Sequence, residues 1–247
     1  MNSFWQLFTA NFKMFYREKE GFYWTVAMPL IIYCALSVIP LNKLVNSGVD
    51  YSSFVLPGII AMTIMQGGIY SLAYWMVDLK ARGVIKRLLA APVKSWQLAL
   101  SLVCSRLAII FIQVALLTLA GRLFFHAQFA GNYFSILILV ALGAPVFLMM
   151  GLLISNYAKS YDAAAPITSG LGLPLTFLSN IFYPLDLLPN ALQAIAKLLP
   201  VTYLADGLRQ AYLYPFDIAL IGKDLFVLSL WLILMALATI KLFRLKE

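Results

Sequence analysis

Few side chains in this 247-residue sequence are of the types that act chemically on a substrate. The single histidine, His126, has no second histidine or cysteine nearby, so a surface histidine is a better interpretation than a metal ligand. Cys34 and Cys104 both fall inside apolar runs, where cysteine usually packs as a small hydrophobic residue. The glycine loop that binds ATP phosphates is also missing, because Gly222 and Lys223 lack the upstream glycine and the following Ser or Thr. We therefore expect a protein that is not an enzyme and that binds no metal or cofactor itself.

Arg106 is the main ionisable residue inside an apolar run. Ionisable residues at membrane depth often mark ion or proton pathways. Arg106 lies only about two helical turns into its run, so its long side chain can also extend to the water interface, and we favour that interpretation. A proton- or sodium-coupled carrier usually needs a buried carboxylate, and the apolar runs show none. We therefore expect the energy for any transport to be supplied by another chain.

The densest group of charges lies between two long apolar runs, in Asp78–Gln97, whose sequence is DLKARGVIKRLLAAPVKSWQ. Five of the eighteen Lys and Arg residues are here, and Asp78 alone opposes them. Short basic loops are retained on the cytoplasmic side of a membrane. The segment also has an apolar helical face, which comprises Val84, Ile85, Leu88 and Leu89. This helix, which Pro92 predicts to end near Ala91, either lies on anionic lipid headgroups or receives a cytoplasmic partner.

The composition identifies the class of protein. Hydrophobic residues make up 63% of the chain and charged residues only 11%, with a mean hydropathy of +0.89. An ordinary soluble domain is about 25% charged. The net charge of +8 would suggest nucleic acid for a soluble protein. Here the basic residues stand at the ends of apolar runs, so we expect contacts with membrane lipid and not with nucleic acid. The sequence therefore predicts an all-α integral membrane protein.

Six apolar runs are candidates for transmembrane helices. They cover residues 22–41, 54–77, 98–121, 133–155, 163–182 and 225–243. A membrane-spanning helix needs about 20 apolar residues, which the first five runs reach and the sixth reaches only marginally. Prolines and glycines, among them Pro166 and Pro174, predict that the fifth run is broken.

The distribution of Lys and Arg predicts the orientation. The pieces 1–21, 78–97, 156–162 and 241–247 together hold twelve of them, the other loops hold five, and Arg106 lies within a run. Because Lys and Arg are retained on the cytoplasmic side, both termini are expected there. Six spans agree with this, since an even number returns the chain to its starting side.

The first 20 residues predict a helix that lies in the membrane plane. They do not read as a signal peptide, because the basic residues follow the apolar ones. On a helix, Gln6, Lys13 and Arg17 share one side. The opposite side is aromatic and comprises Phe4, Trp5, Phe8, Phe12 and Phe15. An aromatic face with a basic back is typical of interfacial helices.

The segment 183–210, between the fifth and sixth runs, contains an apolar stretch of only 13 residues, at 187–199. This is too short to cross a membrane, so it suits a re-entrant hairpin that closes the outer end of a path through the bundle. The plainer alternative is an amphipathic external loop. The residues that define the hairpin are Tyr183, Pro184, Leu188, Pro189, Leu199 and Pro200.

Two stretches of this chain resemble the membrane subunit of ABC-2 type exporters. The first is 57–93, PGIIAMTIMQGGIYSLAYWMVDLKARGVIKRLLAAPV, which is similar to the second span and coupling helix of that family. The second is 182–209, FYPLDLLPNALQAIAKLLPVTYLADGLR, which is similar to the external re-entrant hairpin. Asp78 stands where the family often has Glu, a change that conserves charge. The resemblance implies a single ABC-2 type transmembrane domain over 1–247, in the permease-only form.

The resemblance also implies partners. Two permease copies would pair, as a homodimer, above two copies of a separate ATP-binding subunit that carries ATP and Mg²⁺. The residues that would couple the permease to the ATPase are Arg82, Gly83, Val84, Ile85, Lys86, Arg87, Leu88, Leu89 and Pro92. The apolar members would fill a groove on the ATPase and the basic members would meet polar groups on its rim. Gly83 would permit close approach or a helix start.

Three functions remain open on the sequence alone. The first is a permease that exports drug-like or lipid-like amphiphiles across a bacterial cytoplasmic (inner) membrane. The second is a permease for lipid-linked glycans or cell-wall polymers, which need a wide conduit, often with stacking aromatics. The third belongs to a different class, a membrane scaffold or intramembrane enzyme without an ATPase partner. A neighbouring reading frame with an ATP-binding glycine loop would distinguish the first two functions from the third.

Overall fold

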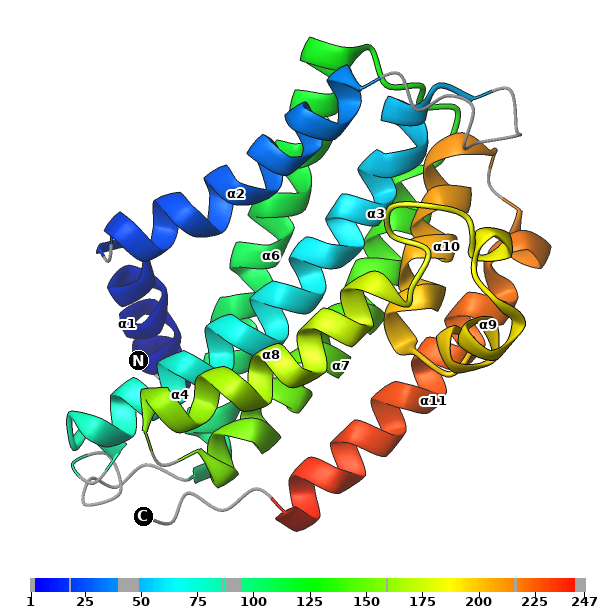
Figure 1. The fold of residues 1–247 in the computed structure, drawn as a ribbon. Helices are drawn as coiled ribbons and strands as arrows, with labels where there is room; N and C mark the ends of the chain where they lie inside the picture. Colours follow the sequence, from blue (N-terminus) through cyan, green and yellow to red (C-terminus); the bar gives the residue numbers. More distant parts are fainter. Residues whose placement is uncertain are drawn as a thin grey trace.

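A computed structural model describes residues 3–17, 19–39, 49–85, 87, 95–158, 160–215 and 217–242. Every regular element in these ranges is a helix, and the helices pack into one bundle (Figure 1). In chain order the elements are α1 (Ser3–Arg17), α2 (Lys19–Val38), α3 (Tyr51–Gln66), η2 (Gly67–Ser71), α4 (Leu72–Ala81), α6 (Ser95–Phe125), α7 (Tyr133–Tyr157), α8 (Tyr161–Phe177), η3 (Leu185–Leu187), α9 (Asn190–Ala196), α10 (Pro200–Leu213) and α11 (Ile218–Leu242).

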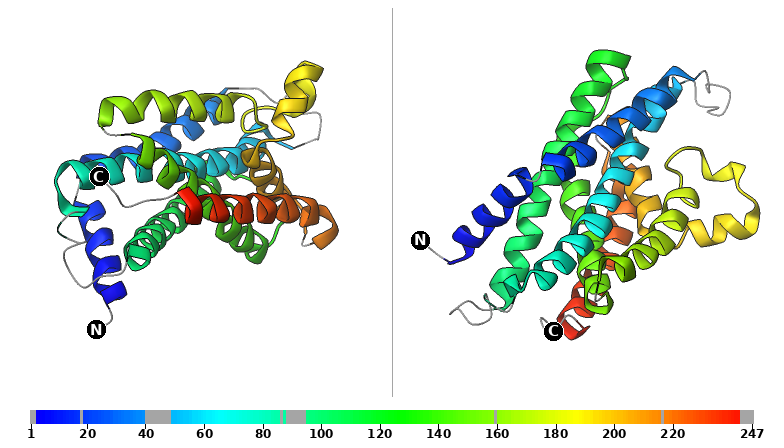
Figure 2. Two further views of the ribbon diagram at one scale, coloured as in Figure 1. Left: turned by 90° about the horizontal axis from the view of Figure 1, so that it is seen from below. Right: turned by 60° about the vertical axis from the view of Figure 1, so that its left-hand side comes forward.

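The helix formed by α3, η2 and α4 lies at the centre of the bundle (Figure 1). Every residue of α3 is buried except Ser52 and Gln66. A helix that is apolar on all sides belongs in the core, because it has no face suited to water. The helices α2, α6, α7, α8 and α10 all contact it, as the two further views in Figure 2 also show. The middle segment η2 is a π-helical turn, a feature that often occurs at functional sites.

Glycines allow α7 to approach η2 closely. A Cβ atom added at Gly68 would lie 2.5 Å from the Cβ of Phe147, and one added at Gly151 would lie 2.4 Å from the carbonyl oxygen of Gly68. Real Cβ atoms do not approach other atoms so closely, so side chains at these two positions would push the helices apart. Small residues serve the same purpose wherever membrane helices pack backbone to backbone.

Four helices are long and apolar enough to cross a membrane, among the residues that the structure describes. They are Tyr51–Ala81, Gln97–Phe125, Tyr133–Tyr157 and Ile218–Leu242. They agree with the predicted runs 54–77, 98–121, 133–155 and 225–243. The last run was marginal on the sequence, but the helix begins earlier, at Ile218, and has 25 residues. The predicted spans at 22–41 and 163–182 are not among the four, so the six-span arrangement stays a prediction.

The predicted break in the fifth run is wrong. Helix α8 continues for 17 residues through both Pro166 and Pro174. Proline is tolerated inside a helix where neighbouring groups satisfy the backbone groups that it leaves free, as in packed membrane proteins. The helix ends only at Phe177, where an irregular stretch begins.

Helix α11 lies at the edge of the bundle and contacts α7 and α10. Large apolar side chains on its other side are exposed, among them Phe226, Leu230, Ile233 and Leu237. They recur every three or four residues, so they form one continuous face. Such a face suits contact with lipid chains, and together with the four long helices it marks an integral membrane protein.

Helix α1 packs along α6 and carries the predicted aromatic row. The rings of Phe4 and Phe8 stack at 6.5 Å between centroids, and those of Phe8 and Phe12 at 6.3 Å. Trp5 is exposed, whereas Phe15 is buried. The aromatic face therefore exists as predicted, but its last member points into the chain. That α1 lies in the membrane plane stays a prediction.

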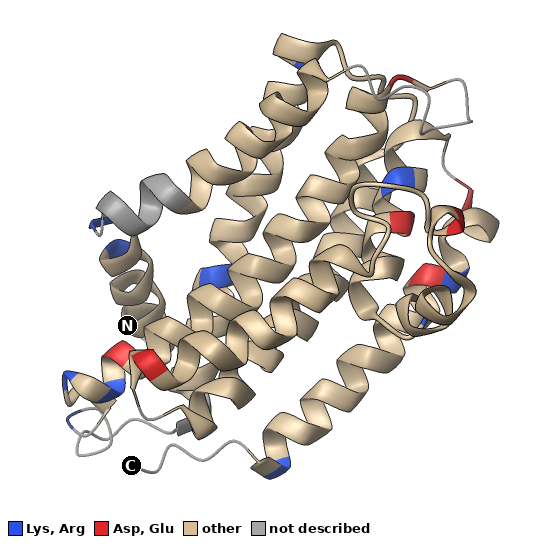
Figure 3. Ribbon diagram, in the orientation of Figure 1, with Lys and Arg blue, Asp and Glu red and all other residues tan. Residues whose placement is uncertain are grey.

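Charged residues gather near the ends of the bundle and in the segment between α8 and α11, and they leave most of the helical length uncharged (Figure 3). Helix α1 and the C-terminal ends of α4 and α11 lie at the same end of the bundle (Figure 1). This arrangement agrees with the predicted placement of 1–21, 78–97 and 241–247 on one side of the membrane. Which side faces the cytoplasm stays a prediction from the charge count.

Candidate functional site

A cavity of about 770 Å³ lies between α2, the central helix, α6 and α8. Its aromatic wall comes mainly from the central helix. The rings of Tyr74 and Tyr161 stack at 4.5 Å between centroids, and Tyr70 meets Tyr74 edge-on at 6.2 Å. Tyr74 also shares a hydrogen bond of 2.9 Å with the hydroxyl of Thr168. The surface of this wall is therefore mostly aromatic, and a hydrogen bond fixes the position of Tyr74 within it.

Gln113 of α6 is one of the deeply buried polar residues that line this cavity, at 3% exposure. Its side-chain nitrogen donates a hydrogen bond of 3.0 Å to the carbonyl oxygen of Thr25 in α2. Its Oε1 atom has no hydrogen-bond partner in the described part of the chain, and neither has the indole nitrogen of Trp75, which also lines the cavity. A buried polar atom without a partner is costly, so both groups favour a ligand that offers hydrogen bonds.

Arg106 lies at the same cavity and joins three elements. Its guanidinium carbon is 4.5 Å from the ring centroid of Phe15 in α1 and 4.7 Å from that of Trp75 in α4, and its Nη1 donates a hydrogen bond of 2.8 Å to Ser71 in η2. The residue is only 4% exposed. The expected extension of Arg106 to the interface is therefore wrong. Two aromatic faces hold the cation inside the bundle.

The proposed coupling segment is described only in part. Helix α4 ends at Ala81, and Gly83 follows with a φ of 65°, which glycine adopts without strain. Arg82 pairs with Asp78 at 2.9 Å. Four of the predicted coupling residues, Lys86, Leu88, Leu89 and Pro92, lie outside the described residues.

The apolar face of this segment is not wholly free in the structure. Ile85 is buried within the core of its own chain and Val84 is half-buried against it, whereas Arg87 is exposed. Because Ile85 is buried in its own chain, it cannot fill the predicted groove on the ATPase in this conformation. Docking of the segment on an ATPase stays a prediction, and its exposed contacts would come from the rest of the segment.

The first four predicted hairpin residues lie in the stretch before α9, Leu199 lies between α9 and α10, and Pro200 is the first residue of α10. Tyr183 donates a hydrogen bond to the carbonyl oxygen of Phe177, and Pro200 begins α10. The backbone before Tyr183 packs tightly on the central helix, since a Cβ atom at Gly58 would lie 2.1 Å from the carbonyl oxygen of Ile181. Ile181 itself is fully buried. The re-entrant depth of this segment stays a prediction.

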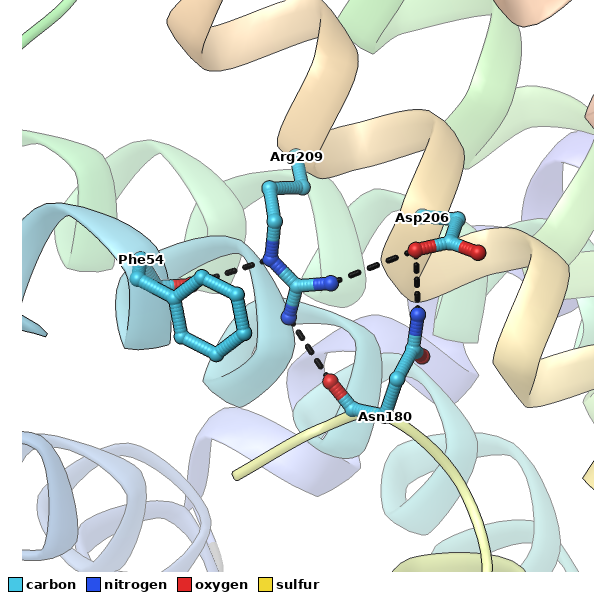
Figure 4. Close-up of polar contacts among 4 residues, drawn as sticks. All are labelled: Phe54, Asn180, Asp206 and Arg209. Carbon is cyan, nitrogen blue, oxygen red and sulfur yellow. Dashed lines mark hydrogen bonds and ion pairs between the residues drawn. The ribbon is translucent and has the colours of Figure 1, made fainter. Parts of the chain in front are cut away.

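Arg209 of α10 ties this segment to the central helix (Figure 4). It donates hydrogen bonds of 2.7 Å to the carbonyl oxygen of Asn180 and 3.3 Å to that of Phe54, and its guanidinium carbon is 3.9 Å from the Phe54 ring centroid. Asp206 pairs with Arg209 at 3.3 Å and also accepts a hydrogen bond from the Asn180 side chain. One cation therefore connects α3, the irregular segment and α10.

The electrostatics of this cluster keep Arg209 charged. Helix α10 has 14 residues and is not among the helices long enough to cross a membrane. Burial lowers the pKa of the Arg209 guanidinium to about 10, and Asp206 partly offsets this. Burial raises the pKa of the Asp206 carboxyl above its ordinary value, against the effect of Arg209. At neutral pH the guanidinium is still protonated.

The structure also corrects the expectation that no carboxylate is buried. Asp224 in α11 is 4% exposed, and its Oδ2 atom has no hydrogen-bond partner in the described part of the chain. Asp224 directly precedes the sixth apolar run in the sequence, so the sequence analysis placed it in the external loop. By contrast, His126 is exposed, as predicted.

Sequence reasoning did not single out Gln113, Arg209 or Asp224. Gln113 had a weak signal, because it is a lone amide within a long apolar run. Arg209 and Asp224 had none, because the surroundings of each depend on contacts with other helices.

The long apolar helices, the lipid-type face of α11 and the central cavity define a multi-pass membrane protein with an internal polar site. The family described as ABC-2 type transporter matches residues 2–213. The chain belongs to this family and is an ABC-2 permease subunit, as the resemblance predicted.

Several relatives are permeases by name. The chain is 28% identical over 200 residues to the inner membrane transport permease YadH of Escherichia coli strain K12, and the match covers 78% of each chain. It is 24% identical over 197 residues to the probable multidrug ABC transporter permease YbhR of the same strain, covering 78% of this chain and 51% of YbhR. It is 29% identical over 208 residues to the putative transport permease ycf38 of Cyanophora paradoxa, covering 81% of this chain and 69% of ycf38.

Proposed function

We propose that this chain exports a drug-like or lipid-like amphiphile from the cytoplasm or the inner leaflet, powered by ATP hydrolysed on a separate subunit. Two copies of the chain pair, and two ATP-binding subunits, each with ATP and Mg²⁺, dock beneath them. The chain itself performs no catalysis. It resides in a bacterial cytoplasmic membrane with both termini inside. Family membership and the permease names of the relatives support this proposal.

The observation that carries the choice of substrate class is the cavity lined by Gln113 and the tyrosine wall. Its volume of about 770 Å³ falls in the range of pockets that hold drug-sized ligands. A compact amphiphile would place its apolar part against Tyr70 and Tyr74 and its polar part near Gln113. A long glycan polymer would need a wider passage, so the cavity favours the amphiphile.

In this proposal the segment around Arg209 closes the outer end of the path. Arg209 holds the irregular segment and α10 against α3 through Asn180 and Phe54. The basic segment after α4 receives the push from the ATPase, and Arg106 links the end of α4 to α1 and α6. Release of substrate would require the contacts of Arg209 to open.

The substrate site is tested by the substitution Gln113→Leu. We expect ATP-dependent uptake of fluorescent amphiphiles into inside-out vesicles to show a roughly tenfold higher half-saturating concentration, because one buried hydrogen bond to the ligand is lost. The variant should still insert, since leucine suits an apolar run. The measurement is the concentration dependence of uptake for those amphiphiles that the parent protein moves.

Gln128→Leu serves as the matched control, because the same change is made at an exposed position outside the cavity. Its uptake should equal that of the parent protein. The cavity is not the substrate site if both variants behave alike. A parent complex that moves no amphiphile would contradict the export proposal itself.

A further inference from the structure

The cavity between α2, the central helix, α6 and α8 is elongated along the central helix. The residues that line it from this helix recur every three or four positions between Thr63 and Asp78, so they belong to one helical face. At 1.5 Å per residue, this face is about 20 Å long. The cavity volume of about 770 Å³ is therefore spread along the helix, and a ligand that fills it is longer than it is wide.

The side-chain oxygen of Gln113 lies beside Gly67 on this face. A Cβ atom added at Gly67 would be 3.7 Å from the Gln113 Oε1 atom. The side-chain nitrogen of Gln113 already donates to the carbonyl oxygen of Thr25, so the oxygen is the group of this amide that lacks a partner. An amide oxygen can only accept a hydrogen bond. A ligand that satisfies it must therefore present an O–H or N–H group at this position.

The indole N–H of Trp75 presents the opposite requirement, farther along the same face. Trp75 is 8% exposed, and the Arg106 guanidinium lies 4.7 Å from its ring centroid. The N–H group at the ring edge has no partner among the described residues, and it can only donate. A ligand must present an acceptor oxygen there. Trp75 is eight positions after Gly67, so the two unsatisfied groups are on the order of 10 Å apart along the helix.

Two aromatic side chains occupy the interval between these polar groups. Tyr70 and Tyr74 both line the cavity, and their positions in the sequence lie between Gly67 and Trp75. Tyr74 is held in place by its hydrogen bond to Thr168. Aromatic rings bind other rings through offset or edge-on contacts. The middle of the cavity therefore suits a ring-bearing, apolar part of a ligand.

The charged groups of the cavity are already engaged. Arg106 donates to Ser71 and lies against two aromatic rings, and Asp78 pairs with Arg82 at 2.9 Å. The two polar atoms described above belong to an amide and an indole, neither of which carries a charge. An ionised group on a ligand would lose its hydration here without gaining a counter-charge of its own. The cavity therefore suits an uncharged ligand.

We propose that Gln113 and Trp75 determine specificity, and that the cavity takes an elongated, uncharged aromatic amphiphile. This ligand carries a hydrogen-bond donor at one end, which binds the Gln113 oxygen, and an acceptor about 10 Å away, which binds the Trp75 N–H. Its rings contact Tyr70 and Tyr74. This inference rests on the proposed export of amphiphiles and specifies which of them the cavity selects.

The test uses three biphenyl probes of nearly equal shape. In 4-acetyl-4′-hydroxybiphenyl a hydroxyl donor and a carbonyl acceptor stand at opposite ends. In 4-acetyl-4′-methylbiphenyl a methyl group replaces the donor, and in 4-hydroxy-4′-isopropylbiphenyl an isopropyl group replaces the acceptor. The Kd of each probe is measured by equilibrium dialysis against the full-length permease in nanodiscs, with empty nanodiscs as the blank. Each variant is compared with the parent for the same pair of probes, so differences in lipid partitioning cancel.

Gln113→Met should remove the preference for the hydroxyl probe over the methyl probe, which in the parent exceeds that of the variant roughly tenfold, because one buried hydrogen bond is lost. The preference for acetyl over isopropyl should stay unchanged in this variant. Trp75→Phe retains an aromatic ring for Arg106 and removes the N–H group, so it should give the reverse pattern. Each variant is thus the control for the other, and Gln113→Leu repeats the first comparison with a second apolar side chain.

A parent protein that binds none of the probes would overturn the proposal. So would preferences that are the same in the parent and both variants, as expected if only water satisfies the two atoms. Loss of both preferences in each variant would indicate a general change in the cavity and would also overturn it. The binding measurements need no ATP. Their failure leaves the export proposal standing, whereas intact discrimination without ATP-dependent transport would contradict export alone.

Discussion

Arg209, a residue of the short helix α10, contacts two segments that are distant from it in the sequence. Three of its contacts are to backbone or carboxylate oxygens on separate parts of the chain. A buried cation with such partners is retained only while they all remain in place, because removing one leaves a desolvated group unpaired. Arg209 therefore reports directly on whether the irregular segment is docked on α3.

Arg209→Leu is expected to lower the free energy of unfolding in detergent by on the order of 2 kcal/mol, because it leaves the carbonyl oxygens of Phe54 and Asn180 without their donor. Asp206 retains 41% side-chain exposure, so its loss of a partner adds little. Lys197→Leu, at an exposed position of the same segment, should change stability by less than about 0.5 kcal/mol. Equal stability of the two variants would mean that the contacts of Arg209 contribute nothing.

At this scale the sequence predicted residue types better than their surroundings. The surface position of His126 followed from its neighbours, whereas the burial of Arg106 and Asp224 did not. Arg106 is held by Phe15, which is 91 positions earlier in the chain, and Asp224 is covered by α10 and α7. Such surroundings depend on how helices pack, and a pattern within one helix contains no information about its partners.

Among the elements, the central helix is the most constrained, because its π-helical turn meets α7 at Gly68 and Gly151. The same turn lines the cavity through Gly67, Tyr70 and Ser71. This turn connects α3 with α4, so α4 can change its position relative to α3 only if the turn changes its conformation. A displacement of the segment after α4 by the proposed ATPase would therefore change the cavity wall through one continuous helix.

Gly68→Ala is expected to destabilise the protein by about 2 kcal/mol, since the added methyl group meets the backbone of Phe147 and overpacks the contact. Gly170→Ala, in α8, is the matched control, because a Cβ atom there has no other atom within 4 Å. It should be neutral or stabilising by up to about 1 kcal/mol, as alanine favours a helix. Thermal unfolding of both variants in detergent checks this, and a Gly68→Ala protein as stable as Gly170→Ala would exclude a tight contact between η2 and α7.

Run length and hydropathy were enough to predict the long helices α6 and α7 close to their observed bounds, because a membrane imposes one length on every span. They also predicted α11, although that helix begins at Ile218, earlier than the predicted start at 225. The same rules failed at α8, where Pro166 and Pro174 were read with the breaking strength that proline has in water. The π-helical turn had no sequence signal beyond its paired glycines, Gly67 and Gly68. Cavity residues such as Gln113 could not be assigned before α2 and α8 were placed around them.

For the whole molecule, the arrangement of ends agrees with a permease that is driven from one side. Helix α1, the end of α4 and the end of α11 gather at one end of the bundle, and the segment tied by Arg209 lies apart from them (Figure 1). The cavity is lined by residues of α1, α2, α3, η2, α4, α6 and α8. This arrangement is compatible with the proposed export, in which an ATPase would act at one end and the segment tied by Arg209 would close the path.

The central claim is that a separate ATPase drives this chain through the basic segment, and complex formation tests it most directly. The permease is co-expressed with a candidate ATP-binding subunit, chosen as a neighbouring reading frame that carries an ATP-binding glycine loop, and co-purification and ATP hydrolysis are measured for the parent, Leu88→Asp and Arg87→Gln. Leu88 lies outside the described residues, so its role rests on the apolar face predicted from the sequence. Arg87 is exposed in the structure.

The parent permease should retain the ATPase, and Leu88→Asp should lose it, because a carboxylate placed in an apolar groove costs on the order of several kcal/mol. Arg87→Gln should weaken binding by about 1 kcal/mol or less, as expected for a charge on the rim. A parent chain that retains no ATP-binding subunit would contradict the account. The reverse order, with Leu88→Asp silent and Arg87→Gln disabling, would leave the segment as an anchor to lipid headgroups and remove the link to ATP.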